Sequence, residues 1–128
     1  DEGIYVGNAD GKDINFTPGC VEYCREHDIQ IQSWGSLCQG LYSGGDLSKA
    51  SQADVNTSIL VSKLAVLYGT SAEAIVLAWL LRHPASIQPI IGTTNVDRIK
   101  ASSDAININL SREHWYELYI SAKGCALP

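Results

Sequence analysis

Two stretches of the chain have the apolar pattern of buried β-strands. Residues 29–34 (IQIQSW) alternate apolar and polar side chains between Asp28 and Gly35, which predicts a strand. Residues 87–91 (IQPII) form a short apolar run with few helix formers and predict a second strand. Pro89 weakens the second pattern because proline cannot donate a ladder hydrogen bond.

Helical spacing of apolar residues predicts two helices between these strands. The first extends from about Asp54 to Tyr68 and ends at Gly69, and its apolar side chains recur at Val55, Ile59, Leu60, Leu64 and Leu67. The second begins at Thr70, which with Glu73 forms a predicted capping box. It ends near His83, before Pro84, and should bury Ile75, Ala78, Trp79 and Leu80.

Three further helices are predicted outside this pair. A short helix opens at Thr17-Pro18, with Thr17 as N-cap, and reaches about His27. Another follows the turn at 92–94, is capped by Thr94 with Asp97, and continues to about Ala105. The last helix follows Ser111 as N-cap and places Trp115, Leu118 and Tyr119 on one face.

The order of elements predicts an α/β unit with parallel strands. Residues 1–17 are predicted to form a loop, and 18–128 to form helix, strand, helices, strand and helices, with a long glycine-rich loop from Gly35 to about Ala53. Strands that alternate with helices favour a parallel sheet. Two strands cannot close a barrel and leave open edges, so 1–128 is interpreted as part of a larger unit.

Composition restricts the class of protein further. Hydrophobic residues make up 45% of the 128 residues and charged residues 18%, as in ordinary globular chains. The net charge of −5 and the scattered basic residues argue against a nucleic-acid partner. No apolar run approaches the roughly 20 residues of a membrane span, and no leader peptide is recognised, so we expect a cytoplasmic protein.

The cysteines give no metal or disulfide pattern. The four cysteines lack paired CxxC spacing, and the histidines do not cluster near them in sequence. We interpret them as structural or free thiols in a reducing compartment. We also find no arrangement of serine, histidine and aspartate, and no phosphate-binding loop motif, that would predict a catalytic group in this segment.

A candidate anion site follows the second predicted strand. Gly92-Thr93-Thr94 leads into a helix whose amino end offers unpaired amides and partial positive charge. The two threonines add hydroxyl groups, and Arg98 adds a guanidinium suited to phosphate. The alternative is an ordinary capped helix with a solvated Arg98.

A second candidate site follows the first predicted strand, at Ser33-Trp34-Gly35-Ser36-Leu37. Ligands of parallel α/β folds bind at the carboxyl ends of strands. Trp34 can stack on a planar ring there, and Gly35 and Ser36 allow a phosphate to approach the backbone. The alternative is that Trp34 fills the core. In one parallel sheet, both candidate sites would face the same side.

Three segments together resemble the aldo-keto reductases. These are IQIQSWGSL at 29–37, EAIVLAWLLRHP at 73–84 and PIIGTTNVDRIKA at 89–101, in the order and spacing of the bacterial and fungal oxidoreductase branch. The resemblance covers roughly 18–128. It implies part of a (β/α)8 TIM barrel, containing the seventh and eighth strands with their helices.

The resemblance also implies that this segment binds NADP(H). Trp34 would stack on the nicotinamide, Gly35, Ser36 and Leu37 would follow the pyrophosphate, and Thr93 and Arg98 would hold the 2′-phosphate. Gly92, Thr94 and Ser102 complete the implied cofactor site. Many relatives have Lys-Ser at 92–93 and Glu-Asn at 101–102, where this chain has Gly-Thr and Ala-Ser.

The resemblance implies NADPH-dependent reduction of a small-molecule carbonyl to an alcohol. The family's catalytic Asp, Tyr, Lys and His belong to the first half of the barrel and have no counterpart in this segment. The alternative is a non-catalytic half-barrel or an interaction module without turnover. Self-association through the open strand edges is a further expectation.

Overall fold

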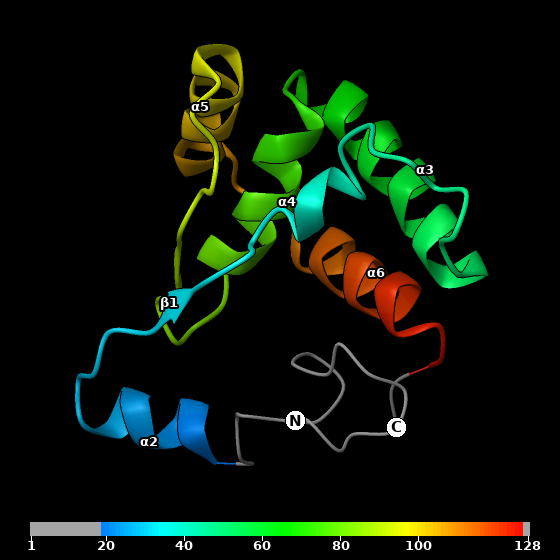
Figure 1. Ribbon diagram of the computed structural model, residues 1–128. Coiled ribbons are helices and arrows are strands. Elements are labelled where there is room, and N and C mark those ends of the chain that lie inside the picture. The colour runs from blue at the N-terminus through cyan, green and yellow to red at the C-terminus, as the bar shows by residue number, and fades with distance from the viewer. Residues whose placement is uncertain (1–18, 127–128) are drawn as a thin grey trace.

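The computed structural model describes residues 19–126, so the predicted loop at 1–17 and the capping role of Thr17 lie outside the described residues. The described elements, in chain order, are α2 (Cys20–Glu26), β1 (Gln32–Ser33), η1 (Cys38–Gly40), α3 (Gln52–Tyr68), α4 (Ala72–Leu81), β2 (Gln88–Pro89), α5 (Val96–Ser103), η2 (Asp104–Asn107) and α6 (Arg112–Lys123). In Figure 1, α2 lies apart from the other helices and leads into β1.

The two strands pair in parallel, as predicted, but each is only two residues long. The amides of Gln88 and Ile90 donate to the carbonyls of Ile31 and Ser33, both at 2.9 Å. Alternate amides of a strand point to opposite sides, so the donor that Pro89 lacks belongs to the edge facing away from β1. Proline is therefore compatible with this pairing.

The predicted strands at 29–34 and 87–91 are too long. Among residues 19–126, each strand has one neighbour, so the backbone near its ends has no second ladder to hold it extended. A side chain holds the two strands together at their amino ends instead, because the side-chain Nε2 of Gln30 donates to the Ser86 carbonyl at 2.6 Å. The register is thus defined by a few bonds at the two strand ends.

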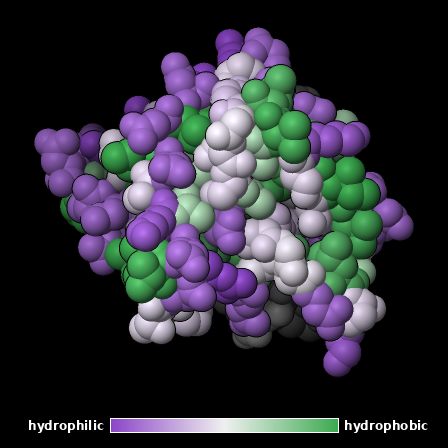
Figure 2. Space-filling model, turned by 90° about the horizontal axis from the view of Figure 1, so that it is seen from above, coloured by the Kyte–Doolittle hydropathy of each residue, from purple (hydrophilic) through white to green (hydrophobic). Residues whose placement is uncertain are grey.

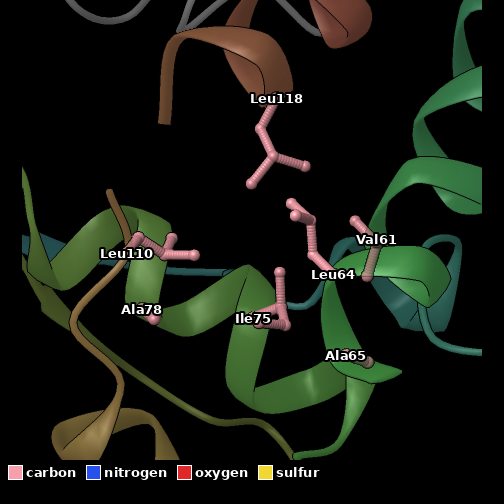
Figure 3. Close-up of a cluster of buried hydrophobic side chains, with 7 residues drawn as sticks. All are labelled: Val61, Leu64, Ala65, Ile75, Ala78, Leu110 and Leu118. Carbon is pink, nitrogen blue, oxygen red and sulfur yellow. The ribbon is translucent and has the colours of Figure 1, made fainter. Parts of the chain in front are cut away.

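The main hydrophobic core lies where α3, α4 and α6 meet. Figure 3 shows its side chains pointing toward one another from these helices and from the segment before α6. The buried members are Val61, Leu64, Ala65, Ile75, Ala78, Leu110 and Leu118. A fully buried side chain such as Ile75 stabilises the fold by about 1.5–3 kcal/mol. A second cluster consists of Ala74, Leu77 and Ala105, and Leu37, Ile91 and Ile108 pack against it.

Helix α3 starts earlier than predicted and buries a different face. Its N-cap is Ser51, which forms a capping box with Asp54, so the helix begins two residues before the predicted start at about Asp54. The inward side includes Val61 and Leu64, whereas Ile59 and Leu67 are 51% and 66% exposed. Apolar residues lie on several sides of α3, so contacts with α4 and α6 select the buried face.

The predicted caps of α4 and α5 are each displaced by one residue. Ser71, not Thr70, caps α4: its hydroxyl accepts from the Ala74 amide and donates to the Ala101 carbonyl, both at 3.1 Å. Asn95, not Thr94, caps α5. The tertiary bond of Ser71 explains the choice between two adjacent hydroxyl residues.

The helix ends also differ from the predictions, while the last helix agrees. Helix α4 ends at Leu81 and α5 at Ser103, where a 3₁₀ turn follows, both two residues before the predicted ends. The amino end of α6 is capped by Ser111, as predicted. Its predicted face is confirmed by Leu118 and Tyr119, which are buried.

Helix α3 also carries an exposed apolar side. Ile59, Val66 and Leu67 are each more than half exposed. In the view from above, hydrophobic surface gathers on the right, the side on which Figure 1 places α3 (Figure 2). No single helix in 19–126 is long and apolar enough to cross a membrane, although α3 and α4 together, bent by 94°, would qualify by length and composition.

Candidate functional site

The segments that follow β1 and β2 both leave the sheet at the carboxyl ends of the strands, here called the site edge, and Ser36 joins them. The Ser36 hydroxyl lies 3.1 Å from the Ser33 carbonyl oxygen and 3.0 Å from the Ile90 carbonyl oxygen. Only 6% of Ser36 is exposed. A buried hydroxyl between two strand-end carbonyls links the two predicted halves of the site directly.

Both segments are also anchored on one apolar cluster. Leu37, three residues after Trp34, and Ile91, immediately before Gly92, both pack against the cluster of Ala74, Leu77 and Ala105. Leu37 is half-buried, so its side chain serves as an anchor of the segment. The shared cluster keeps the two segments adjacent.

Trp34 projects into solvent at this edge. Its side chain is 93% exposed, so the alternative in which Trp34 fills the core is wrong. Gly35 follows with φ +67°, a left-handed conformation that glycine adopts without steric cost. Free space surrounds the position where a Gly35 side chain would begin. The tryptophan ring is therefore available for stacking on a planar ligand.

Arg98 of α5 reaches the segment that follows β1. A Cβ atom built on Gly40 would lie 4.0 Å from the Arg98 Nη2 atom. Gly40 is itself a turn point, because its carbonyl accepts from the amides of Ser43 and Gly45 at 2.9 and 2.8 Å. The guanidinium of Arg98 thus lies beside the loop after β1 while it belongs to the helix after β2.

The amino end of α5 is capped by its own side chains. The Asn95 amide oxygen accepts from the amides of Asp97 and Arg98 at 2.9 and 3.1 Å, and the Thr93 hydroxyl accepts from the Asn95 amide at 3.2 Å. This cap agrees with the alternative to an anion site, an ordinary capped helix with an exposed Arg98. An anion at this end would therefore be met first by the guanidinium of Arg98.

The remaining predicted site residues differ in exposure. Gly92 and Thr94 are exposed, and nothing lies within 4 Å of a Cβ built on Gly92. Ser102 is only 5% exposed, and its hydroxyl has no hydrogen-bond partner. The structure thus exposes Trp34, Gly35 and Arg98, half-buries Thr93, and places Ser102 in the interior.

Sequence reasoning missed a tyrosine–carboxylate pair between the loop after β1 and the first turn of α3. The Tyr42 hydroxyl donates to the Asp54 carboxylate at 2.9 Å. Burial, followed by the bond to Asp54, raises the pKa of Tyr42 well above its usual range. A phenol held in this way is a poor proton donor for a substrate. The feature of the sequence that could have pointed to this pair is Asp54, three residues after the helix cap Ser51.

Two further titratable side chains, His83 and Cys38, have pKa values shifted by burial. The His83 imidazole nitrogen accepts from the Ala85 amide at 3.2 Å, and burial lowers the pKa of His83. Burial, with the charge of Asp54, raises the pKa of the Cys38 thiol. Cys24, Cys38 and Cys125 are free thiols, and no three His, Cys, Asp or Glu side chains group as metal ligands within 19–126.

Comparison with known proteins identifies relatives along most of the chain. The model of the Aldo/keto reductase family matches residues 14–121. A 6-dehydroglucose reductase of Agrobacterium fabrum is 35% identical over 114 residues, which cover 85% of this chain and 34% of that protein. An uncharacterized oxidoreductase of Bacillus subtilis is 28% identical over 114 residues, 89% of this chain and 37% of its own length.

The name of a further relative includes its cofactor. An NADPH-dependent alpha-keto amide reductase of Saccharomyces cerevisiae is 26% identical over 101 residues, 77% of this chain and 30% of that protein. The chain therefore spans about a third of the length of the curated relatives that it matches.

Proposed function

The chain belongs to the aldo-keto reductase family, and we propose that its protein reduces a carbonyl to an alcohol with NADPH, this chain holding the cofactor. One observation carries the proposal. The Ser36 hydroxyl joins the ends of two parallel strands, so an exposed tryptophan and an arginine-bearing helix emerge at one edge of the sheet. Ligand sites of parallel α/β folds lie at this edge.

The segment after β1 would hold the nicotinamide and pyrophosphate. Trp34 offers an indole that is 93% exposed, and stacking of a planar nicotinamide would bury both faces in contact. Gly35, with no side chain and a left-handed conformation, lets the pyrophosphate approach the backbone. Leu37 anchors this segment by packing against the cluster of Ala74, Leu77 and Ala105.

The segment after β2 would hold the 2′-phosphate of the cofactor. Arg98 is exposed and lies beside Gly40, so its guanidinium can reach a phosphate placed between the two segments. Thr93 would contribute its hydroxyl, and Gly92 and Thr94 line the approach. The yeast relative is an NADPH-dependent reductase, which supports a phosphate at this position.

The family implies a (β/α)8 barrel, and the small parallel sheet with its covering helices agrees with a part of one. We assign β1 and β2 to its seventh and eighth strands. Pro89 leaves the outer side of β2 without one amide donor, so a neighbouring strand on that side would pair with one hydrogen bond fewer there.

The chemistry requires a hydride and a proton. NADPH, held by Trp34, Gly35 and Arg98, would supply the hydride for the carbonyl carbon. The carbonyl oxygen takes a proton from an acid that we place outside 19–126, because the Tyr42 hydroxyl is already donated to Asp54. The residues at the edge described here orient the nicotinamide and fix the phosphates.

The substrate that we propose is an aldehyde of a sugar. Two relatives, 35% and 33% identical, are 6-dehydroglucose reductases, from Agrobacterium fabrum and Novosphingobium aromaticivorans. The test uses the natural polypeptide that carries this sequence, assayed for NADPH oxidation with 6-dehydroglucose and with an α-keto amide. Turnover of the sugar aldehyde supports the proposal. Saturable NADPH binding without turnover of either compound supports the non-catalytic alternative.

Stacking by Trp34 is tested by substitution. Trp34→Ala should weaken NADPH binding about 5- to 100-fold, the range of a lost aromatic stacking contact, whereas Trp34→Phe should retain most of it. NADPH fluorescence provides a measurement that does not depend on protein tryptophans. Equal affinity of Trp34→Ala and the unchanged protein would remove Trp34 from the cofactor site.

A further inference from the structure

The Ser36 hydroxyl has a position that the family resemblance does not explain. The resemblance assigns Ser36 to the pyrophosphate, but its side chain is 6% exposed and turned to backbone carbonyls. A hydroxyl has one hydrogen, which here is shared between two acceptors at 3.0 and 3.1 Å. Little donor capacity is left for a phosphate.

The two acceptors belong to the ends of different strands. The Ser33 carbonyl also receives the Ile90 amide at 2.9 Å, so the Ser36 bonds extend the pairing of β1 and β2 by one step. Between Ser33 and Ser36 lies the short turn that carries Trp34. Directly after Ile90 begins the segment that leads to Thr93 and Arg98. One hydroxyl therefore connects the turn that presents the indole to the segment that presents the arginine.

We propose that Ser36 is a positioning residue that sets the spacing between the Trp34 turn and the segment leading to Arg98. This rests on the proposed function, because the spacing matters only for a ligand that contacts both segments. A whole dinucleotide does so, and its affinity depends on both contacts being made at once. A fragment that carries only the adenosine and its 2′-phosphate contacts the Arg98 side alone.

The test compares two ligands in the natural polypeptide that carries this sequence. NADPH spans both segments, and adenosine 2′-monophosphate occupies only the Arg98 side. Ser36→Ala should weaken NADPH about 5- to 10-fold, the loss typical of one buried hydrogen bond, and leave adenosine 2′-monophosphate unchanged. Arg98→Ala should weaken both ligands.

Two further comparisons separate positioning from general damage. Ser43→Ala is the matched control, because that hydroxyl is in the same loop and lies 3.5 Å from the Gly40 carbonyl, within its own segment. It should leave both ligands unchanged. Ser36→Thr and Ser36→Val have the same shape and differ only in the hydroxyl, so Thr should bind NADPH more tightly than Val by the same factor.

Each result decides between the two proposals. An effect of Arg98→Ala without an effect of Ser36→Ala overturns the role of Ser36 and leaves the cofactor site in place. Loss of both ligands in Ser36→Ala shows general loosening and also overturns it. Unfolding of Ser36→Ala and Ser36→Val, with Ser36→Thr folded, assigns the hydroxyl to folding and overturns positioning. If the unchanged protein binds neither ligand, the proposed function itself is contradicted.

Discussion

Trp79 and Trp115 exchange hydrogen bonds, each indole nitrogen donating to the backbone carbonyl of the other residue at 3.0 and 2.9 Å. Their rings are parallel within 4°, with centroids 4.9 Å apart. The pair ties α4 to α6 next to the main core, where a buried polar nitrogen would otherwise lack a partner.

Loss of this exchange should destabilise the fold. Trp115→Phe removes one indole donor and part of the stacking, so the free energy of unfolding should fall by about 1–3 kcal/mol. Denaturant titration with near-ultraviolet circular dichroism measures both the stability and the aromatic packing. Trp34→Phe is the matched control, because that indole is 93% exposed, and should change stability by less than about 0.5 kcal/mol.

The capping box of α3 should give an acid-dependent contribution to stability. Hydrogen bonds from Ser51, and that from Tyr42, hold the pKa of Asp54 below its ordinary value, although burial opposes them. A carboxylate with a lowered folded pKa stabilises above its unfolded pKa of about 4, and this contribution disappears as the pH falls through the folded pKa.

Asp54→Asn tests that contribution. At pH 7 the variant should be less stable by about 1 kcal/mol, the usual value of an N-terminal cap interaction. Because the native carboxylate protonates on acidification, the difference between the two proteins should shrink below about pH 4. Urea titrations from pH 2.5 to 7 provide the measurement. A difference that stays constant across this range would contradict the assignment.

Gly45 should not tolerate a side chain. A Cβ at this position would lie 2.6 Å from the Gly40 carbonyl oxygen and 3.2 Å from the Leu41 amide nitrogen, both backbone atoms. We expect Gly45→Ala to lower the free energy of unfolding by about 1–3 kcal/mol, the cost of overpacking. Gly92→Ala, with open space around its Cβ and no left-handed backbone, should leave stability unchanged or slightly raised.

Gly92 also offers a gain of function. Gly92 is exposed, and nothing lies within 4 Å of a Cβ atom built on it. Gly92→Lys should tighten NADPH about two- to fivefold at low salt by adding a surface charge near the 2′-phosphate, and less at high salt. NADH, which lacks that phosphate, should bind as before. Equal tightening of NADH would place the lysine elsewhere on the cofactor.

The sequence predicted the parallel pairing and the exposed edge for a reason that applies to any α/β chain. Strand, helix and strand in this order must cross over, and both carboxyl ends then meet at one edge. Trp34 and Arg98 could therefore be placed on the same side from order alone. The bridge between them could not, because the bonds of Ser36 depend on the exact spacing of the two segments.

The caps show why local patterns were insufficient at the helix ends. Thr70-Ser71 and Thr94-Asn95 each offer two adjacent residues that can cap. The choice at Ser71 depends on a bond to Ala101, thirty residues later. Ser111 has no such competitor in front of it, since Leu110 precedes it, and the sequence alone identified that cap correctly.

The proposed site requires that Arg98 binds the 2′-phosphate of NADPH, near the point where Ser36 joins the ends of β1 and β2. The most direct measurement is the dissociation constant of NADPH and of NADH for Arg98→Ala and for Lys100→Ala, a matched loss of charge on the same helix. We expect Arg98→Ala to weaken NADPH about 10- to 100-fold and NADH hardly at all, with Lys100→Ala close to the unchanged protein. Equal affinities of NADPH for Arg98→Ala and the unchanged protein would contradict the claim.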